Sequence, residues 1–437
     1  MKLSIPTIAS MCVTALYSTA DAYFVSQLGT SASGAVGVVF ALMTGIQAIG
    51  FTLGMGAGSR ISRSLGAKDE RTANIYGTSA FFFVIAFSAV LCAASLAFLN
   101  PLLRLIGSTE TILPYSRSYA SWILFGAPVM CAAVVMNNVL RAEGHAAFAM
   151  CGLVSGGLIN IVLDPIFIFG LGMGISGAAA ATMLSQTIAF FILLSFFLRG
   201  RSIVRISPKY ISRKPWLYVD IVRLGAPSLF RQGLTTISTA VLNSTAGLWG
   251  DPAVAAMSIV NRIFTFIMAM RIGIGQGFAP VVGYNYGARC FERVRESFRF
   301  TIKYAMLVVT PLAVGVWIFA PEILALFRPG DTEVIAIGTR AMRWQCIALL
   351  LQPLFGNINM LFQATGFPWR ATLIACTRQG IFFMPLIFIL PRLFGLEGVE
   401  ATQAVSDFFS LLFALPFLSW FMKMLNRREA EEEPRIK

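Results

Sequence analysis

Long apolar stretches alternate with short polar segments along the whole chain. Each stretch has about 20 residues or more, the length that a helix needs to cross the hydrocarbon core of a bilayer. Interior Gly and Pro residues do not weaken this interpretation, because membrane helices tolerate both. The pattern predicts twelve membrane-spanning helices, at residues 3–26, 34–58, 74–99, 118–140, 147–169, 175–198, 217–247, 254–280, 302–327, 338–364, 370–391 and 397–422.

The polar segments between these spans differ in charge. If the N-terminus is cytoplasmic, every inner segment carries Lys or Arg, whereas the outer segments carry few or none. Basic residues are enriched on the cytoplasmic side of membrane proteins. The alternation therefore predicts a multi-pass protein of the cell (plasma or inner) membrane with both termini in the cytoplasm. The basic inner segments are 59–72, 141–145, 199–214, 287–299, the turn at Arg370 and the tail from residue 423.

Composition supports the same class. Of the 437 residues, 57% are hydrophobic and 12% charged, about half the charged fraction of a soluble domain, and the mean hydropathy is +0.75. A net charge of +14 would suggest nucleic-acid binding in a soluble protein. Here the basic residues lie in the inner segments, so we expect no nucleic-acid partner. Seven scattered cysteines and the single His145 predict free thiols, no cofactor and no enzymatic centre.

An internal repeat decides how the N-terminus is interpreted. The segment 1–22 resembles a cleaved signal peptide, with Lys2, an apolar core and small residues before Tyr23. When the sequence is shifted so that its two halves overlay, however, Pro6 falls on Pro227, which lies well inside the chain. We therefore expect a first membrane helix that is retained. Three further pairs align, the last with a slippage of one position: "GMGAGSRISRSLGA" (54–67) with "GQGFAPVVGYNYGA" (275–288), "GISGAAAATMLSQ" (174–186) with "GLEGVEATQAVSD" (395–407), and "NNVLRAEG" (137–144) with "NMLFQATG" (359–366).

The repeat predicts an all-α integral membrane fold with two six-helix lobes related by pseudo-twofold symmetry. The expected parts are an N-terminal lobe (1–198), a basic cytoplasmic linker (199–216), a C-terminal lobe (217–422) and a charged cytoplasmic tail (423–437).

Two aspartates in predicted spans distinguish the first half from the second. Asp21 aligns near Leu242 and Asn243, and Asp164 aligns near Pro385, so neither acid is repeated. A carboxylate at mid-membrane costs about 3 kcal/mol and usually marks a functional site. For either acid alone, a structural role is about equally well supported: Asp164 as a hydrogen-bonding group at a proline kink, Asp21 as a wet residue at the membrane edge. The two together favour function.

Polar neighbours of Asp164 predict what the site binds. Asn160 shares its helix face at a spacing of four residues, and Pro165 cannot donate a backbone hydrogen bond to the carbonyl of Ile161. The next span offers Thr182 among small residues, although a hydroxyl alone often bonds its own backbone. Two carboxylates with amide and hydroxyl oxygens in a dry site suit a hard cation or a proton.

The second half carries arginines within its predicted spans instead of these aspartates. Arg271 and Arg378 are placed where their side chains can reach the membrane interface. Arg231 and Arg262 are placed deeper, where they line a wet cavity, bond to backbone or mark a site for an anionic substrate. The first two of these readings are favoured over the third.

These stretches resemble the multidrug and toxic compound extrusion (MATE) transporters, most closely the prokaryotic branch. The resemblance covers nearly the whole chain and is carried by "LYSTADAYFVSQLG" (16–29), "NNVLRAEG" (137–144), "NIVLDPIFIFGLGMGISGAAAAT" (160–182), "LGAPS" (224–228) and "NYGA" (285–288).

The resemblance implies export of amphipathic, often cationic compounds coupled to inward flow of H⁺ or Na⁺. It implies that Asp21, Asn160, Asp164 and Thr182 are the coupling residues, and would be the ligands of Na⁺ if Na⁺ is the coupling ion. Tyr17, Asn137 and Pro6 would line the substrate cavity in the same chamber, and the first helix would change shape about Pro6. Because Asn359 aligns with Asn137, a repeated scaffold role for Asn137 is equally well supported.

Three rival functions differ in what they require. A flippase or exporter of a lipid-linked or anionic substrate would favour an arginine-rich cavity, and the second half partly meets that requirement. A channel would need a continuous polar path, whereas polarity concentrates in one half. A membrane enzyme would need a catalytic constellation. We expect a monomeric transporter whose partners are its amphipathic substrate and membrane lipid.

Overall fold

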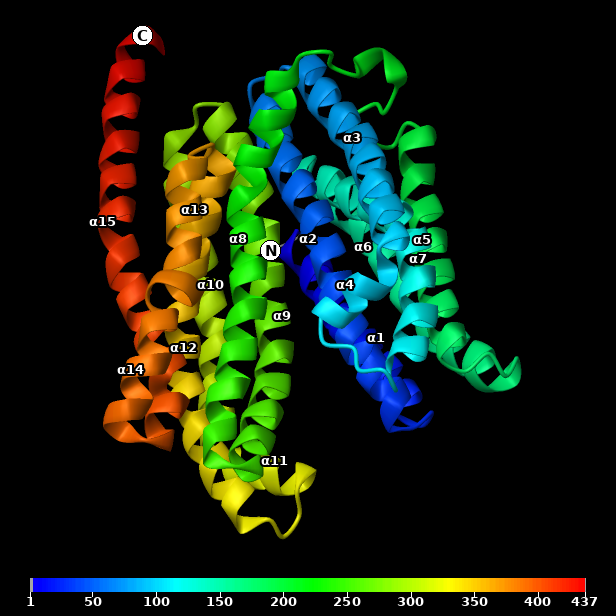
Figure 1. Ribbon diagram of the computed structural model, residues 1–437. Helices are drawn as coiled ribbons and strands as arrows, with labels where there is room; N and C mark the ends of the chain where they lie inside the picture. Colours follow the sequence, from blue (N-terminus) through cyan, green and yellow to red (C-terminus); the bar gives the residue numbers. More distant parts are fainter. Residues whose placement is uncertain (1–2, 437) are drawn as a thin grey trace. The chain divides into compact units, whose positions relative to one another are not determined.

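The computed structural model describes residues 3–436, with the side chains of 3–431. The described chain is helical throughout and contains no strand (Figure 1). Eleven of its helices are long and apolar enough to span a membrane, which confirms the predicted all-α membrane fold. The remaining expected span, 217–247, is present as helix α8, Pro215–Ala246. Its second half contains four Thr and two Ser residues, and α8 is not among the eleven.

The chain forms two compact units, residues 1–229 (unit 1) and 230–437 (unit 2), and the division lies inside α8. Before α8 the helices are α1 Ser4–Ser26, α2 Thr30–Gly66, α3 Glu70–Ala97, α4 Leu99–Leu105, α5 Leu113–Ala142, α6 Ala146–Pro165, the π-helix η1 Ile166–Gly170, α7 Ile175–Leu198 and the 3₁₀ turn η2 Pro208–Tyr210. After α8 they are η3 Gly247–Trp249, α9 Asp251–Gly287, α10 Phe291–Ile318, α11 Ala320–Phe327, α12 Thr332–Thr365, α13 Pro368–Cys376, the π-helix η4 Thr377–Ile381, α14 Phe383–Phe394 and α15 Leu396–Ile436.

The repeat seen in the sequence is also a repeat of structure. The shift that places Pro6 on Pro227 also places both ends of α2 on the ends of α9, and both ends of α3 on the ends of α10. The turn that follows α2 contains Lys68 with φ of 61°, and the turn that follows α9 contains Arg289 with φ of 59°. Positive φ is uncommon for residues other than glycine. The same backbone conformation at equivalent positions therefore shows that the two halves share one local architecture.

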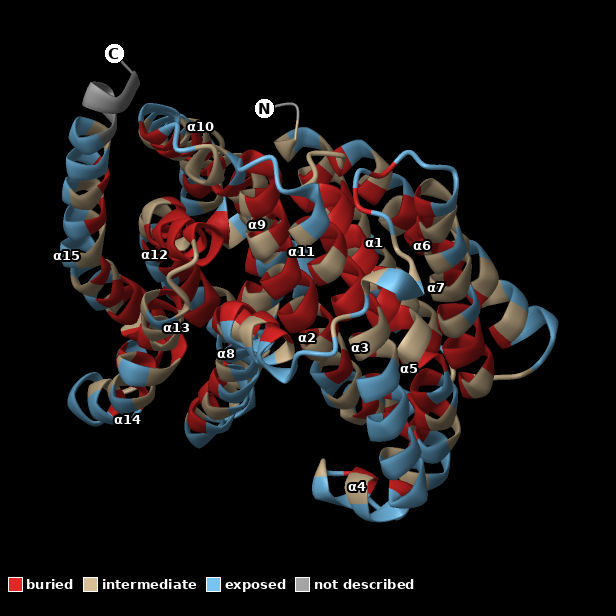
Figure 2. Ribbon diagram, turned by 90° about the horizontal axis from the view of Figure 1, so that it is seen from above, coloured by how far each residue is buried: buried red, intermediate tan, exposed pale blue. Residues whose placement is uncertain are grey.

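Each unit is built around one enclosed helix. In unit 1, α5 packs against α2, α3 and α7, and in unit 2 its counterpart α12 packs against α9, α10 and α15. Figure 2 shows buried positions gathered on helix faces that meet other helices, with exposed positions on the outward faces. Many of the exposed residues are large and apolar, such as Phe125 and Val90. In a membrane protein these side chains face lipid, where apolar exposure costs nothing.

The linker 199–214 is attached to unit 1. Its backbone at Arg205 donates to Asn74 Oδ1 (2.7 Å), and its carbonyl accepts from Thr78 Oγ1 (3.0 Å), both on α3. Glu143, at the end of α5, accepts hydrogen bonds from Ser202 Oγ (2.7 Å) and from the backbone N–H groups of residues 203 (2.8 Å) and 204 (3.2 Å). These contacts explain why the linker belongs to unit 1.

Replacing Glu143 with Ala is expected to release the linker. Three donors lose a charged acceptor whose side chain is fully buried, and hydrogen bonds to charged groups contribute about 1.5–3 kcal/mol each. Limited trypsin digestion of the purified protein should then cleave within 199–214, which holds several Lys and Arg residues, about tenfold faster. Glu70→Ala removes an exposed acid from the first turn of α3 and is the matched control. Equal cleavage rates for the two variants would contradict the prediction.

Candidate functional site

Helix α6 places Asn160 and Asp164 side by side in the interior of unit 1. Their spacing of four residues puts both on one helix face. Asn160 Nδ2 donates to Asp164 Oδ1 at 3.1 Å, and both residues are almost fully buried, 1% and 0% exposed. The second carboxylate oxygen, Oδ2, is buried and has no hydrogen-bond partner among the described residues. The predicted pairing of these two residues is therefore present in the structure.

Thr182 reaches the same place from α7. Its hydroxyl oxygen lies 3.4 Å from Asn160 Nδ2, which donates to it. Thr182 follows four consecutive alanines that are all buried, and such small residues let membrane helices approach closely. This close packing of α7 on α6 brings the hydroxyl to the Asn160–Asp164 pair.

Helix α1 supplies Asp21 and Tyr17. The helix packs along α6, and a Cβ at Gly157 of α6 would lie only 3.1 Å from the Tyr17 ring. The absence of a side chain at Gly157 thus permits α1 to approach. Asp21 lies close enough to Asp164 for the two carboxylates to interact electrostatically. Its Oδ1 atom is buried and has no partner among the described residues.

Tyr119 of α5 completes the group and was missed by the sequence analysis. It is 2% exposed, interacts electrostatically with Asp21 and Asp164, and lies close to the side chain of Thr182. The signal was available in the repeat, because the slippage that pairs Asn137 with Asn359 in the same helix places Ala341 at the position of Tyr119. The comparison of halves considered acids and amides but not phenols, so this asymmetry was overlooked.

The arrangement in unit 1 presents oxygens that need a positively charged or protonated partner. Asp21 Oδ1, Asp164 Oδ2 and Asn160 Oδ1 are all buried without a hydrogen-bond donor among the described residues. Buried acceptors without donors are costly and rare. A proton on a carboxylate, or a cation bound by carboxylate, amide and hydroxyl oxygens, would satisfy them.

Two further predicted residues lie outside this group. Asn137 of α5 is buried, and its Nδ2 donates to the carbonyl of Ala149 in α6 at 2.8 Å. In unit 2 Asn359 bonds the carbonyl of Ala371 in the same way at 2.6 Å, so this brace is a shared feature of the two halves. Pro6 lies in the first turn of α1, where its carbonyl accepts from Ser10 Oγ at 2.8 Å. A role in a substrate cavity for Asn137, Tyr17 and Pro6 stays a prediction.

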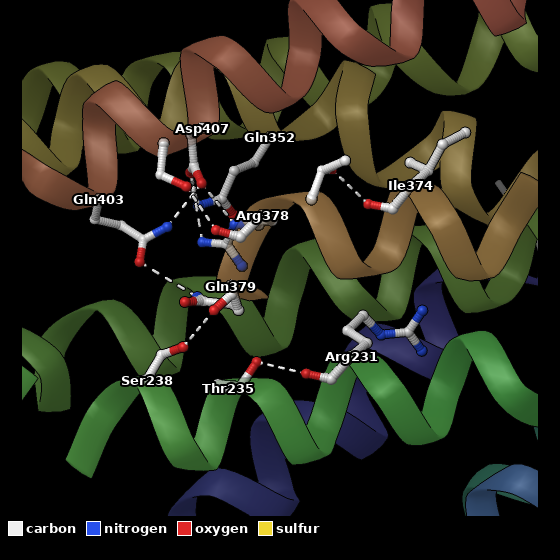
Figure 3. A network of polar contacts seen from close by, with 11 residues as sticks. Arg231, Thr235, Ser238, Gln352, Ile374, Arg378, Gln379, Gln403 and Asp407 are labelled. Carbon is white, nitrogen blue, oxygen red and sulfur yellow. Dashed lines mark hydrogen bonds and ion pairs between the residues drawn. The ribbon is translucent and has the colours of Figure 1, made fainter. Parts of the chain in front are cut away.

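Unit 2 contains a different polar network, centred on Asp407 of α15 (Figure 3). Arg378 forms a two-pronged ion pair with it, with Nε 2.7 Å from Oδ1 and Nη2 3.4 Å from Oδ2. Gln352 and Gln403 also donate to the carboxylate, at 3.0 and 2.7 Å. The expectation that Arg378 extends to the membrane interface is therefore wrong, because a buried acid holds it inside. Asp407 was overlooked because the comparison of halves weighed acids of the first half only.

Comparison with known proteins agrees with this architecture. The MatE family model matches residues 6–166 and 227–389, once in each half of the repeat. The chain is similar to the multidrug export protein MepA of Staphylococcus saprophyticus subsp. saprophyticus, with 24% identity over 432 residues that cover 99% of this chain and 95% of the relative. MepA of Staphylococcus haemolyticus is 26% identical over 408 residues, which cover 93% and 90%.

Solved structures give the same result for the fold. A crystal structure of MATE in complex with MaL6 matches with a TM-score of 0.92 and 28% identity, over 97% of this chain and 96% of the other. An outward-facing multidrug resistance MATE family transporter of the MOP superfamily matches with a TM-score of 0.92 and 28% identity, over 97% and 95%. The MatE model covers well over half of the residues, in both halves. The chain therefore belongs to the MatE family of membrane transporters, the multidrug and toxic compound extrusion (MATE) family.

Proposed function

We propose that this transporter exports amphipathic, cationic compounds from the cytoplasm by antiport with H⁺ or Na⁺. Membership of the family and the similarity to proteins named multidrug export protein support export of small molecules. The proposal goes further in two respects: it assigns H⁺ or Na⁺ as the coupling ion, and it assigns a positive charge to the substrate. The positive-inside charge pattern supports a cytoplasmic location for both termini.

One observation carries the coupling part of the proposal. Three buried oxygens, on Asp21, Asn160 and Asp164, have no donor among the described residues. In a low-dielectric interior two nearby carboxylates cannot both remain ionised without a compensating charge. A proton or Na⁺ arriving from outside supplies that compensation, with Thr182 and Tyr119 as neighbouring hydroxyl groups.

The proposed cycle uses this change in charge. In the outward-open state, uptake of the cation neutralises the site and favours a different packing of α1 on α6. A cationic substrate then loses its electrostatic attraction to unit 1 and leaves to the outside. The transporter reorients, releases the coupling ion to the cytoplasm and binds new substrate. Coupling requires only that ion and substrate prefer different states of the protein.

A vesicle experiment tests the proposal directly. Purified protein in sealed vesicles is given the cationic dye ethidium under a Na⁺ gradient at fixed pH, and separately under a pH gradient at fixed Na⁺. Dye movement should accelerate about 5- to 150-fold with one of the two gradients, the range typical of coupling between sites. A dye flux that is the same with and without either gradient would instead indicate a channel.

A further inference from the structure

Unit 2 contains a pocket lined by three arginines. It lies between α8, α9, α12 and the π-helix η4 with its flanking residues, and its lining includes Arg231, Arg271, Arg378, Gln352 and Gln379. No Asp or Glu is among its lining residues. The pocket shares no residue with the acidic group of unit 1, and the proposed coupling mechanism makes no use of it.

The charges of this pocket are only partly compensated. Arg378 is neutralised by Asp407, and that carboxylate is already occupied by donors from Gln352 and Gln403. Arg271 has no hydrogen bond or ion pair with any described residue, and its Nε atom is buried without a partner. Arg378, Arg231 and Asp407 are the charged groups near enough to act on it electrostatically, two of them with the same sign.

The Arg271 guanidinium lies against the backbone of α12 at Gly356. A Cβ at Gly356 would overlap Arg271 Nη1, so the guanidinium occupies the space that a side chain at Gly356 would need. A charged group held in such a place, without a hydrogen bond or ion pair to any described residue, is costly unless a ligand compensates it. Structural ion pairs account for Arg378 but not for Arg271.

We propose that Arg271, with Arg378 and Arg231, binds an oxyanion, a carboxylate or a phosphate, carried by an amphipathic molecule. Guanidinium groups match the geometry of both oxyanions and bind them through paired hydrogen bonds. Gln352 Oε1 and Gln379 Oε1 are also buried without a donor among the described residues. They would accept N–H groups of the same ligand. The pocket thus suits a transported zwitterion, or an anionic lipid headgroup that enters from the bilayer.

This inference rests on the proposed function in one respect only, namely that the bound molecule is a transported substrate. Binding is measured at equilibrium without an ion gradient, so a failure of antiport and a failure of this proposal are distinguishable. A matched pair of dyes serves as the probe: rhodamine 110 carries a free carboxyl group, and rhodamine 123 is its methyl ester. Fluorescence anisotropy with the full chain in phosphatidylcholine nanodiscs gives the affinity for each dye.

Arg271→Gln is expected to weaken binding of rhodamine 110 about tenfold or more, the effect of losing a charge-assisted hydrogen bond. Binding of rhodamine 123 should change less than about twofold, because the ester offers no anionic partner. Arg271→Lys should restore part of the affinity. Gly356→Ala, which keeps the charge but displaces the guanidinium, should weaken rhodamine 110 selectively. Arg262→Gln is the matched control, since Arg262 lies on the same helix and is exposed.

Nanodiscs that contain phosphatidylglycerol distinguish the two sources of the oxyanion. If an anionic lipid headgroup occupies the site, these discs should abolish the Arg271-dependent part of rhodamine 110 binding that is measured in the zwitterionic phosphatidylcholine discs. If the transported molecule occupies it, they should leave that binding unchanged. Three results would overturn the proposal: no binding of rhodamine 110 by the unmodified protein, the same affinity in Arg271→Gln and Arg262→Gln, or an equal loss of both dyes in Arg271→Gln.

Discussion

The double variant Asp21→Asn, Asp164→Asn is expected to lose gradient-driven dye export by about 100-fold, near the upper end of typical coupling between sites. Asparagine is nearly the same size as aspartate, but it neither takes up a proton nor carries the negative charge that holds Na⁺. Asn160 Nδ2 can donate to a side-chain oxygen at position 164 whether that residue is Asp or Asn. The fold should therefore be retained. Transport in vesicles under the active gradient gives the measurement.

The single variants and a surface control make this result specific. Asp21→Asn and Asp164→Asn alone should each leave one carboxylate and a partial, gradient-dependent rate. Glu110→Gln changes an exposed acid that pairs with Arg104 and should transport like the unmodified protein. Gradient-driven export at the normal rate in the double variant would rule out these aspartates as the coupling site.

Asp407→Ala is expected to destabilise the protein by about 3–5 kcal/mol, the usual effect of removing one partner of a buried ion pair. The carboxylate is 3% exposed and accepts from Arg378, Gln352 and Gln403. Its removal leaves the Arg378 charge and two amide groups without their acceptor. Thermal unfolding of the purified protein in detergent measures the loss.

A second substitution separates lost charge balance from lost packing. Adding Arg378→Leu to Asp407→Ala removes the unpaired charge and should recover a large part of the stability, because uncompensated charge is the main cost. Glu110→Ala, which breaks an ion pair with side chains 58% and 76% exposed, is the control and should change stability by about 0–1 kcal/mol. A double variant as unstable as Asp407→Ala would contradict the explanation.

Much of the fold could be predicted because its signals are local. A run of about 20 apolar residues predicts a helix wherever it occurs in a membrane protein. The constant shift between the halves, visible in glycines and prolines, predicted the pairs α2 with α9 and α3 with α10. The helix face shared by Asn160 and Asp164 follows from a spacing of four residues.

The network in unit 2 could not be predicted in the same way. Asp407 and Arg378 lie 29 residues apart on different helices. The spacing of apolar residues along one helix does not indicate which other helix packs against it. The position of Arg378 in its span favoured the membrane interface, because a long side chain can usually reach water. In the structure, however, Arg378 forms an ion pair with Asp407 of α15.

By itself the sequence determined the helices, their repetition and the two unrepeated aspartates, since these depend on apolar length, spacing and a comparison within one chain. Only the tertiary structure decided which polar groups share a site. It brought Tyr119 to the aspartates, bound Arg378 to Asp407 and left Arg271 without an ion pair among the described residues. The physical reason is that helix packing depends on the fit of many side chains at once. Contacts between distant segments follow from that fit and leave no local pattern in the sequence.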